Sequence, residues 1–177
     1  MAGGDTRQAD EVRIARWVRE HGRCVRGYLL GMVRRPDVAD DLAQEVFQRA
    51  WRARERYRDE GHERAYLLKI ADRLVVDRSR RLGLELTVEE TVWREVEPAS
   101  EDDSPLDGLT RTEMSQQLAA ALDRLTPAQR RVLLLRFFGD LRFEEIAESI
   151  GCPLGTALSH CRRGLIAMRR LLSESMP

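Results

Sequence analysis

Apolar residues recur at helical spacing in three segments of the first half of the chain. Between Asp10 and Val33 they lie three, four or seven positions apart, which predicts a helix with one buried stripe. The turn around Pro36 ends it, and Asp37 is expected to cap a second helix. A third helix is predicted over residues 65–81. Three such stripes can share one core.

The last third of the chain shows the same periodicity and clearer boundaries. Thr126 followed by proline, with Gln129 three residues after the cap, predicts a capping box at a helix that Gly139 closes. A short helix then covers 143–150, and a longer basic helix runs from about 153–155 to 172. Two helices around a glycine-bounded turn are typical of a DNA-binding helix-turn-helix. No segment has a strong strand pattern, so the predicted fold class is all-α.

Charge divides the chain into three parts. Residues 1–81 carry 19 basic and 14 acidic side chains, residues 82–110 carry 1 and 9, and residues 111–177 carry 10 and 7. The middle part lacks a sustained amphipathic period and is rich in Ser and Pro, which predicts a flexible acidic linker. A short docked helix is the alternative, because apolar residues recur at Leu84, Leu86, Val88, Val92 and Trp93. We therefore expect helical domains at 1–81 and 111–177, joined by this linker.

Several function classes are disfavoured. No run approaches the roughly 18 apolar residues of a membrane span, and the N-terminus lacks the pattern of a signal peptide, so we expect a cytoplasmic protein without membrane insertion. The three cysteines form no CxxC pair, and His160 and Cys161 are adjacent, a poor spacing for chelation. We expect neither a metal nor a cofactor. The three histidines lie in separate segments, which disfavours an enzyme.

Two long motifs resemble one known family. ADDLAQEVFQRAW in the first half, and LTPAQRRVLLLRFFGDLRFEEIAESIG in the last third, are similar to the extracytoplasmic-function (ECF) sigma factors of the sigma-70 family. The resemblance covers roughly residues 10–174. It implies a dissociable subunit of bacterial RNA polymerase, without catalysis of its own, that binds promoter DNA at the minus-thirty-five and minus-ten elements. It also implies an anti-sigma factor as partner, and we expect a monomer when free.

The resemblance assigns roles to individual residues. Phe47 and Trp51 are assigned to core packing, whereas the polar face of the same helix is expected to bind core polymerase: Asp41, Gln44, Glu45 and Gln48. Minus-ten DNA is expected to contact Arg64, Tyr66, Lys69, Arg73, Arg78, Arg80 and Arg81. Minus-thirty-five DNA is expected to contact Thr156, Leu158, Ser159, His160, Arg162 and Arg163.

The chain departs from its relatives at a few of these positions. Leu158 and His160 stand where two cations are common, which predicts weaker attraction for phosphate and an unusual minus-thirty-five preference. Asp72 stands where a basic residue is common, and Arg73 where asparagine is common, so base preference at the minus-ten element is open. Arg142 replaces the usual Ser or Thr cap, which predicts a less firmly started short helix.

Two alternatives to promoter-directed initiation remain. One is a degenerate sigma that binds core polymerase or an anti-sigma factor without initiating transcription. The other is a conventional regulator that uses the same helix-turn-helix. The acidic linker either threads the polymerase cleft in place of nucleic acid, as the resemblance implies, or serves only as a tether.

Overall fold

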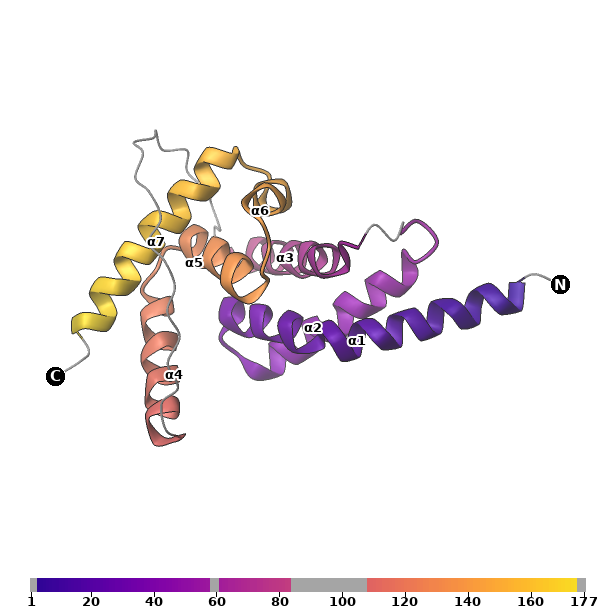
Figure 1. The fold of residues 1–177 in the computed structure, drawn as a ribbon, viewed down its shortest axis with the longest axis horizontal. Helices are drawn as coiled ribbons and strands as arrows, with labels where there is room; N and C mark the ends of the chain where they lie inside the picture. The colour runs from indigo at the N-terminus through magenta and orange to yellow at the C-terminus, as the bar shows by residue number, and fades with distance from the viewer. Residues whose placement is uncertain (1–2, 58–60, 84–107, 175–177) are drawn as a thin grey trace.

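A computed structural model describes residues 3–57, 61–83 and 108–174 of the chain, with side chains from residue 8 in the first range and from residue 116 in the last. The described residues form helices only (Figure 1). An N-terminal lobe holds α1 (Gly3–Val33), α2 (Pro36–Arg52) and α3 (Glu63–Arg81). A C-terminal lobe holds α4 (Gly108–Asp123), α5 (Pro127–Leu133), the π-helical turn η1 (Leu134–Phe138), α6 (Phe143–Ile150) and α7 (Leu154–Glu174). The predicted all-α fold is confirmed.

The core of the N-terminal lobe is formed by the predicted apolar stripes. Trp17, Val25, Val46, Leu67 and their neighbours are fully buried where the three helices meet. Gly22 does not interrupt α1, and no atom outside the helix backbone lies within 4 Å of the position where its Cβ would be. One long helix therefore supports both α2 and α3.

The start of α2 differs from the prediction. Arg35 occupies the N-cap position, Pro36 is the first helical residue, and no side chain caps the helix. Asp37 instead lies in the first turn and pairs with Arg35 (Nη2 to Oδ2, 2.5 Å). Since proline fixes φ and needs no hydrogen-bond partner for its nitrogen, it can begin the helix without a side-chain cap.

The predicted capping box at Thr126 is confirmed. The Thr126 hydroxyl accepts from the Gln129 amide, and the Gln129 side chain accepts from the Thr126 amide, each at 3.3 Å. The helix does not end in a left-handed glycine, because Gly139 has a φ of −82° and Asp140 has the positive φ of 53°. Glycine at position 139 instead allows the backbone to pass close to the preceding helical turn. A Cβ there would lie 2.5 Å from the Leu135 carbonyl oxygen.

The helix-turn-helix consists of α6, a turn at Gly151 and α7. Gly151 has a φ of 70°, a conformation that suits glycine at a helix C-terminus. At the other end of α6 the Glu145 carboxylate accepts from the Arg142 amide at 2.8 Å. This bond satisfies the backbone N–H of Arg142 at the start of the helix. The Arg142 side chain does not cap the helix, so the stabilising hydrogen bond comes from Glu145 in the first turn.

The two lobes pack against each other. Buried side chains of both lobes belong to one continuous apolar cluster, and Figure 1 shows the C-terminal lobe against α1 and α3. Two glycines on α1 allow the close approach: Leu134 packs against Gly31, and the Phe138 ring packs against Gly27. The acidic linker expected at 82–110, with its alternative of a docked helix, lies mostly outside the described residues.

Candidate nucleic-acid interface

One face of α3 gathers most of the predicted minus-ten contacts. Tyr66, Lys69, Arg73 and Arg80 are three, four and seven positions apart, so they share a side of the helix opposite its buried stripe. Arg64 lies in the first turn, away from this row. Arg78 and Arg81 lie in the last turn, outside this row. We call the row of four the α3 basic face.

The first turn of α3 borders a cleft of about 440 Å³. Tyr66 is half-buried there in an aromatic cluster, with its ring centroid 4.7 Å from that of Tyr57 and 6.0 Å from that of Trp17. Burial raises the pKa of Tyr66. The far wall of the cleft comes from α6, through Glu144, Glu145 and Glu148. The cleft therefore has a basic, aromatic wall and an acidic wall from different lobes.

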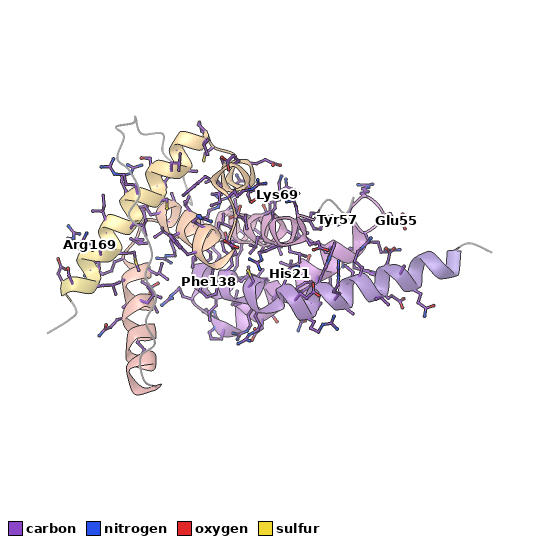
Figure 2. All side chains as sticks on the ribbon, in the orientation of Figure 1. His21, Glu55, Tyr57, Lys69, Phe138 and Arg169 are labelled. Carbon is purple, nitrogen blue, oxygen red and sulfur yellow. The ribbon has the colours of Figure 1, made fainter. Side chains whose placement is uncertain are left out.

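Acidic groups of the C-terminal lobe lie close to basic side chains around this cleft. Lys69 Nζ donates to the Glu148 carboxylate, and Lys69 lies on α3 close to α6 (Figure 2). Arg64 Nη1 lies 3.5 Å from Asp140 Oδ2, and His62 Nδ1 lies 3.5 Å from Glu145 Oε1. The hydrogen bond from Lys69 lowers the pKa of Glu148. Two of the basic side chains paired in this way, Lys69 and Arg64, are predicted minus-ten contacts.

The structure gives a reason for an acidic residue at position 72, where a basic one is common in the family. It is fully buried and lies beneath α5, where Arg131 donates two hydrogen bonds to its carboxylate and Tyr28 donates a third at 2.6 Å. Burial lowers the pKa of Arg131, but the hydrogen bond to Asp72 and its charge outweigh burial and hold that pKa above its ordinary value. Asp72 thus joins the two lobes and does not face solvent.

The outer face of α7 is exposed and only weakly basic. Leu158, Arg162, Leu165 and Arg169 follow at spacings of three and four along it, with Ile166 beside them. Figure 2 shows Arg169 toward the C-terminal end of this helix. Leu165 is 45% exposed and Ile166 58%. The Arg163 side chain folds back toward the Ser159 carbonyl oxygen at 3.4 Å. Apolar groups therefore separate the cations on this side of the helix.

Two predicted minus-thirty-five contacts lie in the core. Thr156 and His160 are each 5% exposed, beside the fully buried Ala157. Burial lowers the pKa of His160, and Arg163 adds to the effect. A side chain enclosed in its own lobe does not reach a base edge, so these two positions are corrected to structural ones. Leu158, Ser159, Arg162 and Arg163 remain the predicted contacts.

Two of the four predicted polymerase-binding residues, Gln44 and Gln48, line an open groove between α1 and α2. The groove has a volume of about 530 Å³, and Val18, Gln44, Phe47, Gln48, Trp51 and Arg52 line it. Asp41 is exposed beyond it, and Glu45 is held by Arg49 at 2.8 Å, which lowers the pKa of Glu45. Apolar walls with amides at the rim are typical of protein-binding surfaces.

Trp51 differs from its predicted role in core packing. It is half-buried in the groove wall, and the Arg54 guanidinium lies 4.4 Å from its ring centroid. Phe47 is also partly exposed to the groove but packs against the buried cluster. The sequence pattern did not distinguish these two aromatic residues, because both fall on the apolar side of an amphipathic helix.

Comparison with known proteins identifies the family. Residues 17–84 match Sigma-70 region 2, and residues 115–168 match Sigma-70, region 4. The chain is 30% identical to the RNA polymerase sigma-H factor of Pseudomonas aeruginosa over 82% of this chain and 79% of that protein. It is 29% identical to the ECF RNA polymerase sigma factor SigK of Mycolicibacterium vanbaalenii over 84% of this chain and 76% of that protein.

Solved structures agree with this fold. The sigma factor RpoE of Bartonella quintana, solved with the anti-sigma factor NepR, superposes with a TM-score of 0.65 at 23% identity, covering 89% of this chain and 96% of that one. CnrH, solved with the cytosolic domain of CnrY, superposes at 0.68 and 17% identity, covering 97% and 95%. The chain belongs to the sigma-70 family, as an ECF sigma factor. It is an RNA polymerase sigma factor for promoter-specific transcription initiation.

Within the described ranges, no helix combines the length and apolar character of a membrane span. In the same part of the chain, no three His, Cys, Asp or Glu side chains form a metal-binding group. Cys24, Cys152 and Cys161 are free thiols, and burial raises the pKa of each.

Proposed function

We propose that three surfaces of this chain divide the work of initiation in the cytoplasm. The α1/α2 groove binds core RNA polymerase, the α3 basic face holds the minus-ten strand, and the outer face of α7 reads the minus-thirty-five element. The observation that carries the proposal is the α3 basic face beside an aromatic cleft. Cations bind a phosphate backbone, and an aromatic ring can stack on an unstacked base.

The polymerase surface is assigned from shape and composition. Gln44 and Gln48 lie at the rim of an apolar groove, and Asp41 extends the same polar face. A partially polar surface suits a subunit that must bind and leave the core enzyme. The chain supplies no catalysis of its own in this proposal, and the polymerase performs the chemistry. An anti-sigma factor is the expected regulatory partner of a chain that is monomeric when free.

The test is multi-round transcription with bacterial core polymerase on a genomic promoter library, with start sites mapped by sequencing RNA ends. Discrete starts that require the protein, preceded by two shared sequence elements, are expected. Core binding without starts would favour a degenerate sigma. Neither core binding nor starts would favour an independent helix-turn-helix regulator.

A matched pair of variants tests the polymerase surface. Gln48→Ala should weaken core binding at the groove, whereas Gln116→Ala removes an exposed glutamine of the C-terminal lobe and should leave it unchanged. Binding is measured by competition for fluorescently labelled core polymerase. Equal affinities of the two variants would contradict the assignment.

A further inference from the structure

We infer that Glu63 is a positioning residue for the aromatic wall on which a minus-ten base stacks. Two side chains of α1, Arg16 and Trp17, hold its carboxylate. The same tryptophan packs against the rings of Tyr57 and Tyr66. The inference rests on the proposed role of α3 in binding the minus-ten strand. It gives α1 a part in base preference, although no motif of the sequence assigns one to this helix.

The Glu63 carboxylate is held in a largely enclosed position. Glu63 is the first residue of α3, and its side chain is only 17% exposed. Its Oε1 accepts hydrogen bonds from Arg16 Nη2 and from Trp17 Nε1, the latter at 3.1 Å. Exposed ion pairs contribute little, but a charge with little access to water depends on its protein partners. The two donors therefore fix where α3 begins relative to α1.

Trp17 connects this carboxylate to the aromatic cluster. Its ring is fully buried and meets the Tyr57 ring edge to face, with the centroids 4.8 Å apart. The Tyr66 ring lies 6.0 Å away on the same measure. Since Glu63 and Tyr66 are three residues apart, they lie on neighbouring turns of one face of α3. A displacement of the first turn would therefore move the Tyr66 ring with it.

The chain between α2 and α3 is anchored to α1 at its α2 end as well. Arg13 Nη2 donates to the Arg54 carbonyl oxygen at 3.1 Å and to Asp10 Oδ1 at 2.7 Å. Arg54 Nε lies 3.3 Å from Asp10 Oδ2, and Asp10 is buried. The Arg13 guanidinium also lies 5.9 Å from the Tyr57 ring centroid. α1 thus holds the chain on both sides of the aromatic wall.

A fixed wall affects base preference more than binding itself. Stacking on an aromatic ring tolerates any base, so preference depends on how well the rings and the polar groups around them fit one base. Such a fit requires that the contacts behind the binding groups hold their geometry. Loss of the Glu63 contacts should therefore weaken the discrimination between bases while the basic side chains of α3 still attract the strand.

The experiment compares the full-length wild type with Glu63→Ala and Glu55→Ala. Glu55 is the matched control, because its side chain carries the same charge, is 78% exposed and lies in the same connection (Figure 2). Each protein transcribes, with core polymerase, a barcoded library of one mapped promoter whose minus-ten and minus-thirty-five elements are randomised. For Glu63→Ala alone, we expect the preference between bases at the minus-ten element to fall about fivefold, with the minus-thirty-five preference unchanged.

A second matched pair guards against a folding defect in the first. Arg16→Met removes the ion pair from a side chain that is 40% exposed, whereas Arg19→Met removes a 76%-exposed arginine of the same helix. Only Arg16→Met should lower the minus-ten preference. Glu63→Gln should restore most of the preference lost in Glu63→Ala, because the amide oxygen can still accept from both donors.

Hydrogen exchange measures the positioning step without DNA. Mass spectrometry of the peptide that covers the first turns of α3 should show faster exchange for Glu63→Ala than for Glu55→Ala or the wild type. The peptides of α2 should exchange at the same rate in all three proteins, which separates a local displacement from unfolding of the lobe.

The outcomes separate this inference from the proposed function. Unchanged exchange at the start of α3 overturns positioning. A uniform loss of transcription that preserves the minus-ten preference, or no recovery in Glu63→Gln, shows a merely structural role and overturns the inference. Wild-type starts support the proposed function whatever the variants do. Without wild-type starts the proposed function fails, and this inference fails with it.

Discussion

The two helices proposed to contact DNA differ in both charge and exposure. The α3 basic face carries Lys69, Arg73 and Arg80 but lies beside the C-terminal lobe, which supplies acids to its first turns. The outer face of α7 is open to solvent, yet Leu158 and Leu165 interrupt its cations. The fold therefore covers the more basic surface only at its first turns, near Lys69, whereas Arg73 and Arg80 are exposed.

The largest expected effect comes from Arg131→Met, which should separate the lobes and expose the first turns of α3. Removing one partner of a buried ion pair costs about 3–5 kcal/mol, because the other charge is left without compensation. Asp72 regains water if the lobes separate, so we expect separation instead of unfolding. Small-angle scattering should report a larger radius, while circular dichroism should report an unchanged helix content.

The neighbouring arginine is the control for this change. Arg130 donates to the carbonyl oxygens of Leu122 and Asp123, both at 2.9 Å and within its own lobe. Arg130→Met should therefore lower the stability of the C-terminal lobe without separating the lobes. A compact radius for Arg131→Met would show that the buried pair does not hold the closed arrangement.

A smaller effect is expected from Leu158→Lys, which gives α7 the charge that it lacks. One added phosphate contact should raise the affinity for duplex DNA several-fold and steepen the slope of log K against log salt by about 0.9. Anisotropy titrations at several potassium chloride concentrations measure both quantities. Ile166→Lys adds the same charge about two turns further along the helix and should have a weaker effect. An unchanged affinity and slope for Leu158→Lys would reject the predicted contact.

The smallest expected effect is on stability and comes from His160, which lies on the buried face of α7 and not on its outer face. Neither ring nitrogen has a hydrogen-bond partner, and burial lowers the pKa of His160 from an ordinary value near 6.5. The unfolded chain therefore binds a proton more readily than the folded one, so stability falls as pH drops below about 6.5 and is independent of this group above it.

Replacing the imidazole tests that pH dependence. His160→Leu should raise stability by about 1 kcal/mol near neutral pH, because an unpaired polar group leaves the core, and by more under mildly acidic conditions. Thermal unfolding followed by circular dichroism across this pH range measures both effects. Parallel pH profiles for the variant and the wild type would indicate that His160 is hydrated in the folded protein.

The helices could be predicted from the sequence because their signals are local. The capping box at Thr126 and the glycine turn at Gly151 each depend on residues within one turn of each other. The buried side of α7 was not predicted, although Ala157, Cys161 and Met168 share its spacing. Thr156 and His160 flank that stripe, and their polar character suggested a DNA contact that their burial excludes.

The packing of the lobes could not be predicted in the same way. Asp72 and Arg131 are 59 positions apart, and no periodicity within either helix marks them as partners. Asp72 could be identified only as a departure from a family pattern. The acidic residues of α6 likewise have the spacing of a solvent-facing helix side, so their contact with α3 became visible only in three dimensions.

The pair of glycines on α1 has a consequence for how such a protein can change over generations. A glycine codon becomes an alanine codon through a single nucleotide substitution, and at Gly27 or Gly31 that substitution adds a methyl group at the lobe contact while favouring the helix. The packing of the two lobes can thus be altered, or restored, in one mutational step that leaves untouched every residue proposed to bind polymerase or DNA.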